Sequence, residues 1–333
     1  MWEAWGGGRI CCERRSWRPS ASFWVLRGLA CAFALVLVGI KAGEAVPSAI
    51  RIATYNIENY ILEPEPTRPA KSLLARSKVQ EMLLEMRADV VALEEIGPLA
   101  ALDELRESLA VNGLRYPYWE HVAGHDTNIH VAVLSRFAFQ ARRSITNANY
   151  LLNGRRMFVS RGFAELDIEP HPGYRFTLIA AHLKSKRMAT FADEAELRQH
   201  EALMLRERVD AVLRSNPKVN LIVLGDFNDT PNSLPIRTLL GRGASSLVDT
   251  RPVESDGRNN NAAARVSSVD SRTVAWTHYF AREDSYQRLD YILLSSGAAR
   301  EWERLRSFVL AYPGWGIASD HRPVVVTIVP RDR

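Results

Sequence analysis

Short apolar runs alternate with longer amphipathic stretches along most of the chain. The run at 221–224 is continuous and made of Leu, Ile and Val, a pattern typical of a strand that is covered on both faces. Similar patterns predict strands at 50–56, 89–93, 128–136, 162–168, 175–181 and 323–329, and a strand pair from 273–280 and 287–294. Strands therefore recur from residue 50 to the end of the chain.

Three amphipathic stretches, at 72–86, 99–109 and 194–213, predict helices between these strands. The first repeats apolar residues at nearly the helical spacing, at Leu73, Leu74, Val79, Met82, Leu83 and Met86. In the third we expect the charged side chains to face solvent, at Glu196, Arg198, Glu201, Arg206, Glu207 and Arg208. The Pro-rich stretch 63–69 and the polar stretch 256–264 are typical of surface loops.

The strand pattern at 221–224 leads directly into a polar turn. Gly225 frees the backbone, and Asp226 and Asn228 follow two positions apart. If the extended conformation continues through Phe227, the carboxylate and the carboxamide lie on the same side of the chain while Phe227 enters the core. Two interpretations remain open on this stretch alone: an ordinary turn, or part of a polar site on a rigid support.

Polar residues also stand at the ends of other predicted strands, or within them, at Asn56, Glu95, His182, Asp290, Asp320 and His321. Each has an ordinary explanation, such as a turn, a helix start or a hydrogen-bonded structural histidine. All of these explanations would have to hold at once for the set to be without function. The joint occurrence therefore favours one shared polar site.

The first 45 residues differ from the rest of the chain. A basic lead precedes an apolar run of twelve residues at 29–40, and small residues at 42–45 offer a cleavage site. This order is typical of a secretory signal peptide. We therefore divide the chain into 1–45, a signal peptide or amino-terminal anchor, and 46–333, an exported domain that is secreted or periplasmic. The apolar run is short for a membrane span, so we expect membrane contact only through an uncleaved leader.

Removing the leader changes both the cysteine count and the net charge. All three cysteines lie in it, at Cys11, Cys12 and Cys31, so the exported domain has neither a thiol nucleophile nor a thiolate zinc site. The leader also holds six of the 43 Lys and Arg residues and three of the 38 Asp and Glu residues, and the remaining 37 and 35 give a net charge of +2. A nearly neutral domain gives no strong electrostatic argument for long nucleic acid.

Seven short motifs follow one another along the mature chain. They are 54–59 (TYNIEN), 89–96 (DVVALEEI), 131–136 (VAVLSR), 181–185 (AHLKS), 225–229 (GDFND), 288–293 (RLDYIL) and 319–324 (SDHRPV). This set, in this order, resembles the endonuclease/exonuclease/phosphatase superfamily of DNase I-like metal-dependent phosphoesterases. The resemblance implies an α+β fold, a four-layer αββα sandwich in which two packed mixed β-sheets are flanked by helices. The sequence departs from the family at Glu94, where Gln is usual, so we expect one more negative charge at the site.

The resemblance also implies catalytic roles for five residues. Asp226 would position or deprotonate the attacking water, and Asn228 would donate a hydrogen bond to a phosphoryl oxygen. His321, oriented by Asp290, would be a second acid or base or a phosphate contact. His182 would contact the phosphate or protonate the leaving oxygen.

A divalent cation, Mg²⁺ or Mn²⁺, is implied by the same resemblance and suits hard oxygen ligands. Glu95, helped by Asn56, would hold it, and Asp320 would complete its surroundings or those of His321. Further phosphate contacts are conceivable from Arg155, Arg156, Arg161, Lys184, Lys186 and Arg187. A zinc site is a weaker interpretation of His121, His125 and His130, because their spacing is irregular.

These inferences converge on an exported, divalent-metal-dependent phosphoesterase that acts by in-line attack of water. A phosphodiester, as in a nuclease, is the first expectation, and a phosphomonoester is the second. The alternatives are a sphingomyelinase or inositol-phosphate type of phosphatase, with Trp315 as a candidate lipid contact, and a catalytically silent binding module. We expect a monomer whose partner is a phosphoester substrate, with nucleic acid among the candidates.

Overall fold

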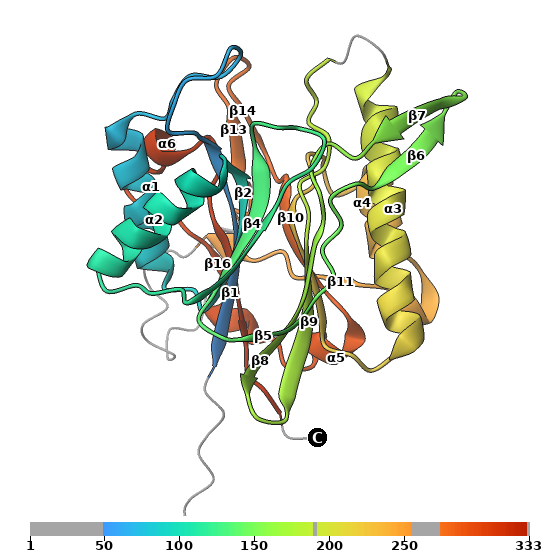
Figure 1. The fold of residues 1–333 in the computed structure, drawn as a ribbon. Helices are drawn as coiled ribbons and strands as arrows, with labels where there is room; N and C mark the ends of the chain where they lie inside the picture. Colours follow the sequence, from blue (N-terminus) through green and yellow to red (C-terminus); the bar gives the residue numbers. More distant parts are fainter. Residues whose placement is uncertain (1–48, 189–191, 255–273, 332–333) are drawn as a thin grey trace, which may run out of the picture. The chain divides into compact units, whose positions relative to one another are not determined.

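The computed structural model describes residues 49–188, 192–254 and 274–331, all within the unit Ala45–Arg333. Here two β-sheets lie face to face, and helices cover the outer face of each (Figure 1). The expected αββα sandwich is confirmed. The predicted leader and the loop predicted at 256–264 lie outside the described residues. Within those residues, no helix has the length and apolar character needed to cross a bilayer.

The first sheet has seven strands in the order β12-β16-β17-β1-β2-β4-β3. At its centre β1 (Ile50–Tyr60) runs antiparallel to β17 (Val324–Ile328) and parallel to β2 (Val90–Ile96). The outer strands are β4 (His130–Ser135), β3 (Tyr118–Val122), β16 (Phe308–Val309) and β12 (Val253–Glu254). Because β1 and β2 are parallel neighbours, the polar residues at their carboxyl ends lie at the same edge.

The second sheet has six strands in the order β11-β15-β10-β9-β8-β5. Its centre is β10 (Leu221–Asp226), parallel to β9 (Tyr174–Ala180) and antiparallel to β15 (Asp290–Leu294). The others are β8 (Ala164–His171), β5 (Phe139–Arg142) and β11 (Val248–Asp249). Alternate side chains of the central strands fill the space between the sheets or contact the helices, which explains the continuous apolar runs.

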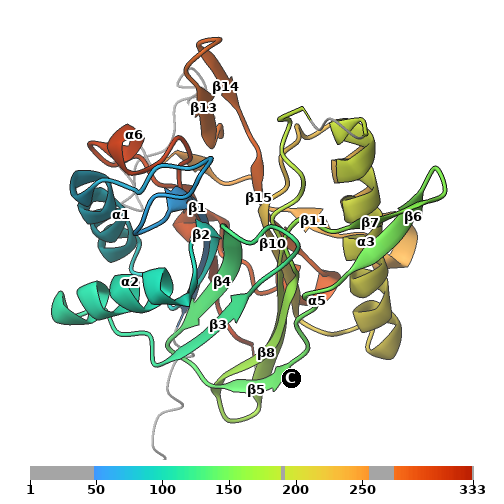
Figure 2. The ribbon, with the colours of Figure 1, turned by 45° about the horizontal axis from the view of Figure 1, so that its top comes forward.

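The predicted strand pair from 273–280 and 287–294 is wrong in its pairing. The second segment forms β15, and its apolar residues are covered inside the main sheet beside β10. The first ends in β13 (His278–Phe280), which instead pairs with β14 (Ser285–Gln287) through the short turn between them. Figure 2 shows this hairpin standing out from the body near the start of β15.

Helices α1 (Leu73–Met86) and α2 (Leu99–Val111) pack on the first sheet, and α3 (Glu194–Ser215) and α4 (Leu234–Leu240) on the second. The shorter elements are the hairpin β6 (Asn149–Leu152) and β7 (Arg155–Phe158), the helices α5 (Ser296–Ala299) and α6 (Trp315–Ala318), and the 3-10 turns Gly243–Ser245 and Arg304–Arg306. All three long predicted helices are present, with ends within about two residues of the predicted ones.

Two expectations about helix faces need correction. Leu73 and Leu74 belong to the first turn of α1 and are exposed, so the buried stripe starts only at Val79. In α3 three charged residues expected on solvated sides are buried, namely Arg198, Glu201 and Arg206. Their partners come from segments far away in the sequence, which local periodicity cannot reveal.

Candidate active site

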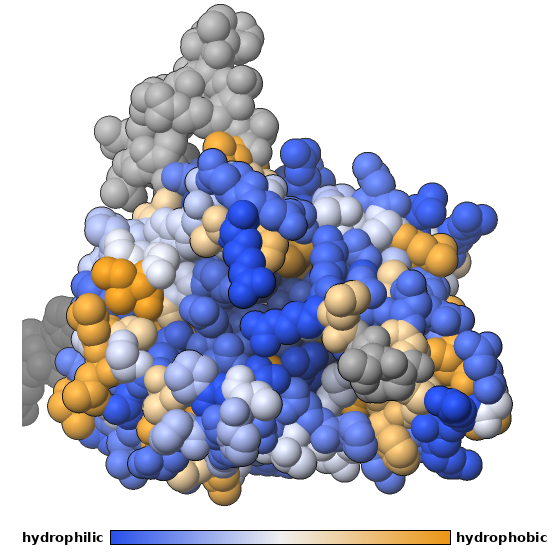
Figure 3. Space-filling view, turned by 90° about the horizontal axis from the view of Figure 1, so that it is seen from above, coloured by the Kyte–Doolittle hydropathy of each residue, from blue (hydrophilic) through white to orange (hydrophobic). Residues whose placement is uncertain are grey.

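Six polar segments converge where β1, β2 and β10 end. Seen from above, this end of the molecule has a hollowed, hydrophilic centre, and apolar patches lie toward its periphery (Figure 3). Asn56, Asp226, Asp290 and His321 are buried there and His182 is almost fully covered. Contacts below 4.1 Å connect these side chains to one another and to Glu95. The spatial convergence expected of the predicted site residues is thus present.

Asp226 ends β10 and closes a tight turn on itself. Its Oδ1 accepts the backbone N–H of Asn228 at 2.8 Å, and Asn228 has a positive φ of 54°. Phe227 between them is fully buried and stacks on Tyr291. The extended conformation therefore stops at Asp226, and the turn rather than strand alternation places both polar groups together. The stretch is therefore a hydrogen-bonded turn that also holds two polar groups at the end of a buried strand.

Gly225 is required by a close approach of two chain segments. Its φ is 140°, and a Cβ at this position would lie 1.8 Å from the carbonyl oxygen of Ala181. That carbonyl directly precedes His182. The glycine therefore allows β10 and the end of β9 to approach closely enough for His182 Nε2 to lie 3.5 Å from Asp226 Oδ2.

Two carboxamides hold the Asp226 carboxylate. Asn56 Nδ2 donates to Asp226 Oδ2 at 3.0 Å, and Asn228 Nδ2 donates to the same oxygen at 3.2 Å and to the carbonyl of Leu183 at 3.0 Å. Asn56 Oδ1 in turn accepts the N–H of Glu58. In this arrangement Asn56 and Asn228 orient carboxylates, so the predicted cation contact of Asn56 and phosphoryl contact of Asn228 stay predictions.

Burial raises the pKa of Asp226 to about 7. The positive charge of His321 lowers this pKa, whereas repulsion from Asp290 adds to the increase. Asp290 is its direct cross-strand partner on β15, so two carboxylates face each other on neighbouring strands. Such an arrangement is costly unless a proton or a cation is present. It is the type of perturbed acid that general base catalysis at neutral pH requires.

Glu95 lies at a break in strand register. The pairings of β2 with β1 and with β4 both shift here, and Glu95 has a positive φ of 64°. Strict alternation would send adjacent side chains to opposite faces, but the bulge turns Glu95 to the strand end. Its Oε2 accepts the N–H of Asn59 at 3.0 Å, and its Oε1 lies 3.4 Å from Asn56 Nδ2. The strained backbone thus serves to aim one carboxylate.

Glu94 points the other way, into the space between the sheets. It is fully buried, and its Oε1 accepts the hydroxyl of Thr54 at 2.7 Å. Burial raises the pKa of Glu94 well above its usual value, and the nearby Asp290 and Asp226 raise it further. A raised pKa favours the protonated form of Glu94, which is as neutral as the Gln usual in the family, and the extra negative charge expected at this position stays a prediction.

His321 and Asp290 form a buried acid–imidazole pair. His321 Nδ1 and Asp290 Oδ2 are 2.8 Å apart, and His321 Nε2 faces Asp226 Oδ2 at 3.8 Å. Burial alone would lower the pKa of His321, but Asp290 and Asp226 outweigh it and raise that pKa well above its usual value. Ser319 fixes the loop by donating to the carbonyl of Asn56 and accepting the N–H of His321. The imidazole is thus held protonated and oriented.

His182 is the neutral counterpart of His321. Burial lowers its pKa well below the usual value, and the positive charges of Arg161, His321 and Arg68 lower it further. Neither ring nitrogen has a hydrogen-bond partner among the described residues. A buried imidazole without partners in the site is available to a ligand.

Carboxylates and histidines here fit a divalent cation. Asp320 lies at the rim, where it and His278 offer ligand atoms within 4.8 Å of each other, and Asp226 and Asp290 do the same beside His321. A protonated His321 has no lone pair for a cation, so the carboxylates and His278 are the candidate ligands. Burial raises the pKa of Glu58, and repulsion from Asp320 and Glu95 adds to it. Oxygen-rich, mutually repelling acids are what Mg²⁺ or Mn²⁺ would stabilise.

Three site residues were missed at the sequence level: His278, Glu58 and Lys71. His278 Nε2 lies 3.6 Å from Asp320 Oδ2, and its ring is 4.6 Å from that of His321. Lys71 Nζ donates to the carbonyl of Glu58 at 2.8 Å. Glu58 belongs to the 54–59 motif and could have been noticed there, whereas nothing near His278 or Lys71 in the sequence marks them.

The zinc interpretation of the three histidines finds no support in the described residues. His121 Nε2 lies 3.0 Å from the carbonyl oxygen of Gly97 and its ring meets His130 edge-on, while His125 stacks on Phe158. No potential metal group in that part of the chain includes them. Trp315, the candidate lipid contact, packs against Trp276 with ring centroids 5.3 Å apart.

Comparisons with solved structures show the same fold in other proteins. The chain resembles the human Nocturnin catalytic domain with bound sulfate anion (18% identity, 84% of this chain and 93% of that chain, TM-score 0.56). It also resembles truncated TDP2 from Caenorhabditis elegans (16%, 85% and 98%, 0.54) and sphingomyelinase C from Streptomyces griseocarneus (18%, 84% and 99%, 0.54). No curated protein sequence matches the chain.

A sequence model of the Endonuclease/Exonuclease/phosphatase family matches residues 53–321. This range begins on β1 just before Asn56 and ends on His321, so it includes all eight predicted site residues. The chain therefore belongs to the Endonuclease/Exonuclease/phosphatase family, whose members are phosphoesterases.

Proposed function

We propose that this protein is an exported phosphoesterase that depends on a divalent cation, Mg²⁺ or Mn²⁺, and cleaves a phosphodiester by in-line attack of water. The observation that supports it best is one continuous series of contacts. It runs from Asp290 to His321 (2.8 Å), Asp226 (3.8 Å), Asn56 (3.0 Å) and Glu95 (3.4 Å). In this proposal Asp226 is the base, His321 the charged imidazole and Glu95 the cation ligand.

In the proposed reaction Asp226 accepts a proton from the attacking water. Asn56 and Asn228 hold its carboxylate, and burial keeps its proton affinity suited to neutral pH. His321, kept protonated by Asp290, donates from Nε2 to the phosphate or to the leaving oxygen. His182 contacts the phosphate as a neutral imidazole.

Glu95 and Asp320, with His278 and Glu58 beside them, would hold the cation. When bound, it would neutralise phosphate charge and align the attack. The chain's own contribution is to keep these oxygens in place before binding: the N–H of Asn59 fixes Glu95, and His278 lies against Asp320.

The test is hydrolysis of bis-p-nitrophenyl phosphate with Mg²⁺, with Mn²⁺ and with EDTA. We expect turnover with either cation and none with EDTA, and His321→Ala should remove it. His171→Ala is the matched control, because that ring stacks on Tyr174 at the tip of the β8–β9 hairpin, remote from the site. A folded wild-type chain that hydrolyses no phosphoester would instead be a silent binding module.

Export rests on the leader at 1–45 and remains part of the proposal. Mass spectrometry of the protein recovered from the periplasm or medium should show a mature chain that starts near residue 46. A full-length chain retained in the membrane fraction would favour the anchor instead. Size-exclusion chromatography with light scattering should give the mass of one chain.

A lipid or small-molecule phosphate is the second candidate substrate. One observation favours it: the β13–β14 hairpin presents exposed aromatic rings at Phe280 and Tyr286 beside the site. Plasmid DNA, RNA, sphingomyelin and inositol phosphates should be compared under one metal condition. Preferential hydrolysis of sphingomyelin would replace the nuclease-like assignment.

A further inference from the structure

Two arginines lie beside the candidate active site and share one carboxylate. Arg68 follows β1 in the loop before α1, and Arg161 lies between β7 and β8. A nitrogen of each guanidinium lies near Asp126 Oδ2, at 3.2 Å for Arg68 and 3.6 Å for Arg161. We call Arg68, Arg161 and Asp126 the arginine cradle.

The cradle is built by close backbone approach. A Cβ on Gly124 would lie 2.6 Å from the Cα of Arg161, and a Cβ on Gly162 would lie 2.5 Å from the carbonyl oxygen of Ile145. The N–H of Asp126 donates to the carbonyl of Ser160 at 2.8 Å. Glycines at both points let the two segments come together, so Arg161 is held by backbone geometry as well as by its ion pair.

Helix α3 braces the same region from the other side. The buried carboxylate of Glu201 accepts the N–H and hydroxyl of Ser160, and its second oxygen accepts the N–H of Lys184 at 2.6 Å. Ser160 directly precedes Arg161, and Lys184 follows His182 by two positions. One side chain therefore fixes the positions of the cradle and of His182 relative to each other.

The cradle carries more positive than negative charge. Two guanidiniums contact one carboxylate, that of Asp126, and the side chains of Arg161 and Arg68 are only 7% and 16% exposed. The buried carboxylate of Glu201 also attracts Arg161, but its oxygens already accept hydrogen bonds from Ser160 and from the N–H of Lys184. The Nε of each lacks a hydrogen-bond partner among the described residues. Burying a cation without a full counter-charge is costly. Such an arrangement is expected where an anion binds and supplies the missing charge and acceptors.

Two contacts connect the cradle to the reacting centre. Arg68 donates to Asn59 Oδ1 at 2.5 Å, and the N–H of Asn59 donates to Glu95 Oε2 at 3.0 Å. In this order of contacts Glu95 stands between the cradle and the Asp290–His321 pair, and Glu201 connects Ser160, next to Arg161, with the segment that carries His182.

We propose that the arginine cradle binds a second phosphate of the substrate, next to the phosphate that reacts. The reacting phosphate already has Glu95, His182, Asp226 and His321 around it, and the cradle lies beyond that group. The substrate class is then a phosphoester that carries at least one further phosphate, either an oligonucleotide or a polyphosphorylated sugar alcohol. A choline lipid, whose remaining head group is cationic, does not match this charge. This inference rests on the proposed function.

The first test compares dithymidine monophosphate (TpT), which has only the reacting phosphate, with pTpT and TpTp, which have one more on either side. Wild-type protein should prefer pTpT or TpTp by roughly tenfold in kcat/KM, mostly through KM, as expected for charge-assisted hydrogen bonds. Arg161→Gln should lose that preference and keep its rate on TpT within about threefold. To test a sugar-alcohol substrate in the same way, kcat/KM for inositol 1,4-bisphosphate is compared with kcat/KM for inositol 1-phosphate.

Compared with Arg161→Gln, Arg161→Lys should regain part of the preference, because lysine restores the positive charge but lacks the planar guanidinium that makes two parallel hydrogen bonds to a phosphate. Arg136→Gln is the matched control: this arginine pairs with Asp89 at the opposite end of β2 and is half exposed. If Arg161→Gln does not fold, Arg68→Gln removes the more exposed member of the pair. An equal loss on TpT and on the longer substrates would overturn the proposal, because the cradle would then serve the reacting phosphate or the fold alone.

A binding measurement separates this inference from the proposed function. With Mg²⁺ present, thymidine 3′,5′-bisphosphate should raise the melting temperature more than either thymidine monophosphate does, and Arg161→Gln should remove the difference. If wild-type protein shows this difference but hydrolyses nothing, the cradle stands and the phosphoesterase assignment fails. If it hydrolyses TpT but shows neither the binding difference nor the substrate preference, the cradle inference fails.

Discussion

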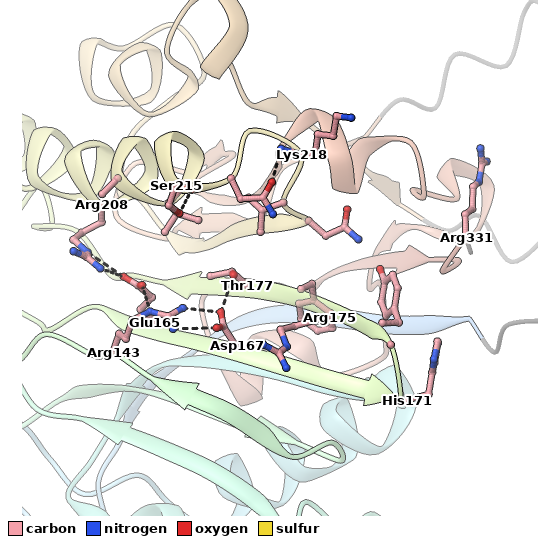
Figure 4. A pocket seen from close by; sticks show the side chains of 18 of the residues that line it. Arg143, Glu165, Asp167, His171, Arg175, Thr177, Arg208, Ser215, Lys218 and Arg331 are labelled. Carbon is pink, nitrogen blue, oxygen red and sulfur yellow. Dashed lines mark hydrogen bonds and ion pairs between the residues drawn. The ribbon is translucent and has the colours of Figure 1, made fainter. Parts of the chain in front are cut away.

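The candidate active site and a groove near the opposite end of the second sheet treat charge in contrasting ways. The groove holds about 810 Å³ between α3 and strands β8 and β9 (Figure 4). Its acids are matched: Glu165 contacts Arg143 at 2.7 Å and Arg208 at 2.6 Å, and Asp167 contacts Arg143 at 2.6 Å. At the site, Asp226 and Asp290 have histidines and amides as partners instead.

The contrast is clearest in two carboxylates. Burial alone would raise the pKa of Asp167, but hydrogen bonds from Arg143 and Thr177 lower it. Burial raises the pKa of Asp226 to about 7, because no arginine or lysine compensates it. The groove therefore uses its charges for stability, whereas the site retains carboxylates whose negative charge is made unfavourable by burial. A large hollow alone is a poor guide to function here.

The largest expected effect is on turnover. Asp226→Asn and His321→Ala should each lower kcat by roughly 10³-fold, the range expected for loss of a general base or acid. Asp226→Asn should also lower the melting temperature, because both carboxylate oxygens accept N–H donors and the NH2 group of the new amide would face one of them. Steady-state kinetics and thermal unfolding measure the two effects. Asp167→Asn in the groove is the control and should leave kcat unchanged. A comparable loss of kcat in this variant would contradict the distinction between the groove and the candidate active site.

The pH dependence of stability should have opposite signs in the two regions. Between about pH 4 and 7 the folded protein binds more protons at Asp226 than the unfolded chain does, so the free energy of unfolding falls as pH rises, by roughly 1.4 kcal/mol per pH unit at most. His321, whose pKa is also raised, extends this loss to higher pH. Asp167 has a lowered pKa, so its contribution is lost only as pH falls below the usual range of an aspartate.

Urea unfolding in EDTA at about pH 3, pH 5 and pH 8 measures this difference, since the lowest pH reaches the acid-side loss at Asp167 and the other two the alkaline-side loss at Asp226. Asp226→Asn should weaken the loss of stability on the alkaline side, and saturating Mg²⁺ should do so in the wild type. Asp167→Asn should weaken the loss on the acid side instead. Identical pH profiles for wild type and Asp226→Asn would contradict the raised pKa.

A smaller effect is expected from Glu165→Gln. This change leaves Arg143 and Arg208 without their shared carboxylate and should destabilise the fold by about 2 kcal/mol, below the value for a fully buried pair because both arginines are partly exposed. Activity should stay within twofold. Chemical denaturation and turnover of the same preparation test both halves of the expectation, and a large loss of activity would connect the groove to catalysis.

The smallest effect is expected from Glu94→Gln. Because burial favours the protonated form of Glu94, replacing it with the neutral isostere should change kcat/KM less than about threefold and leave the apparent affinity for Mg²⁺ unchanged. Glu95→Gln is the adjacent comparison and should abolish tight cation binding. A strong gain in Mg²⁺ affinity in Glu94→Gln would show that Glu94 is charged after all.

Of these two regions, only the candidate active site could be anticipated from the sequence. The site residues Asn56, Asp226 and His321 stand at ends of apolar runs, so their places in the sequence marked them. The groove residues gave no such signal, because Glu165 and Asp167 alternate with apolar residues in an ordinary strand. The sequence pattern likewise assigned charged residues of α3 to solvent, although Arg198 pairs with Asp229 and Arg206 donates to the carbonyl oxygens of Leu239 and Ser245.

By itself, the sequence determined the alternation of strands and helices and the set of polar strand ends, and the resemblance of its motifs to a family implied the layers. These follow from local periodicity and from short motifs, which depend on neighbours within a few positions. Only the tertiary structure decided that Glu95 turns to the strand end while Glu94 is buried, that β13 pairs with β14, and that His278 joins the site. Each of these depends on strand register, burial or a partner far away along the chain, which no local pattern encodes.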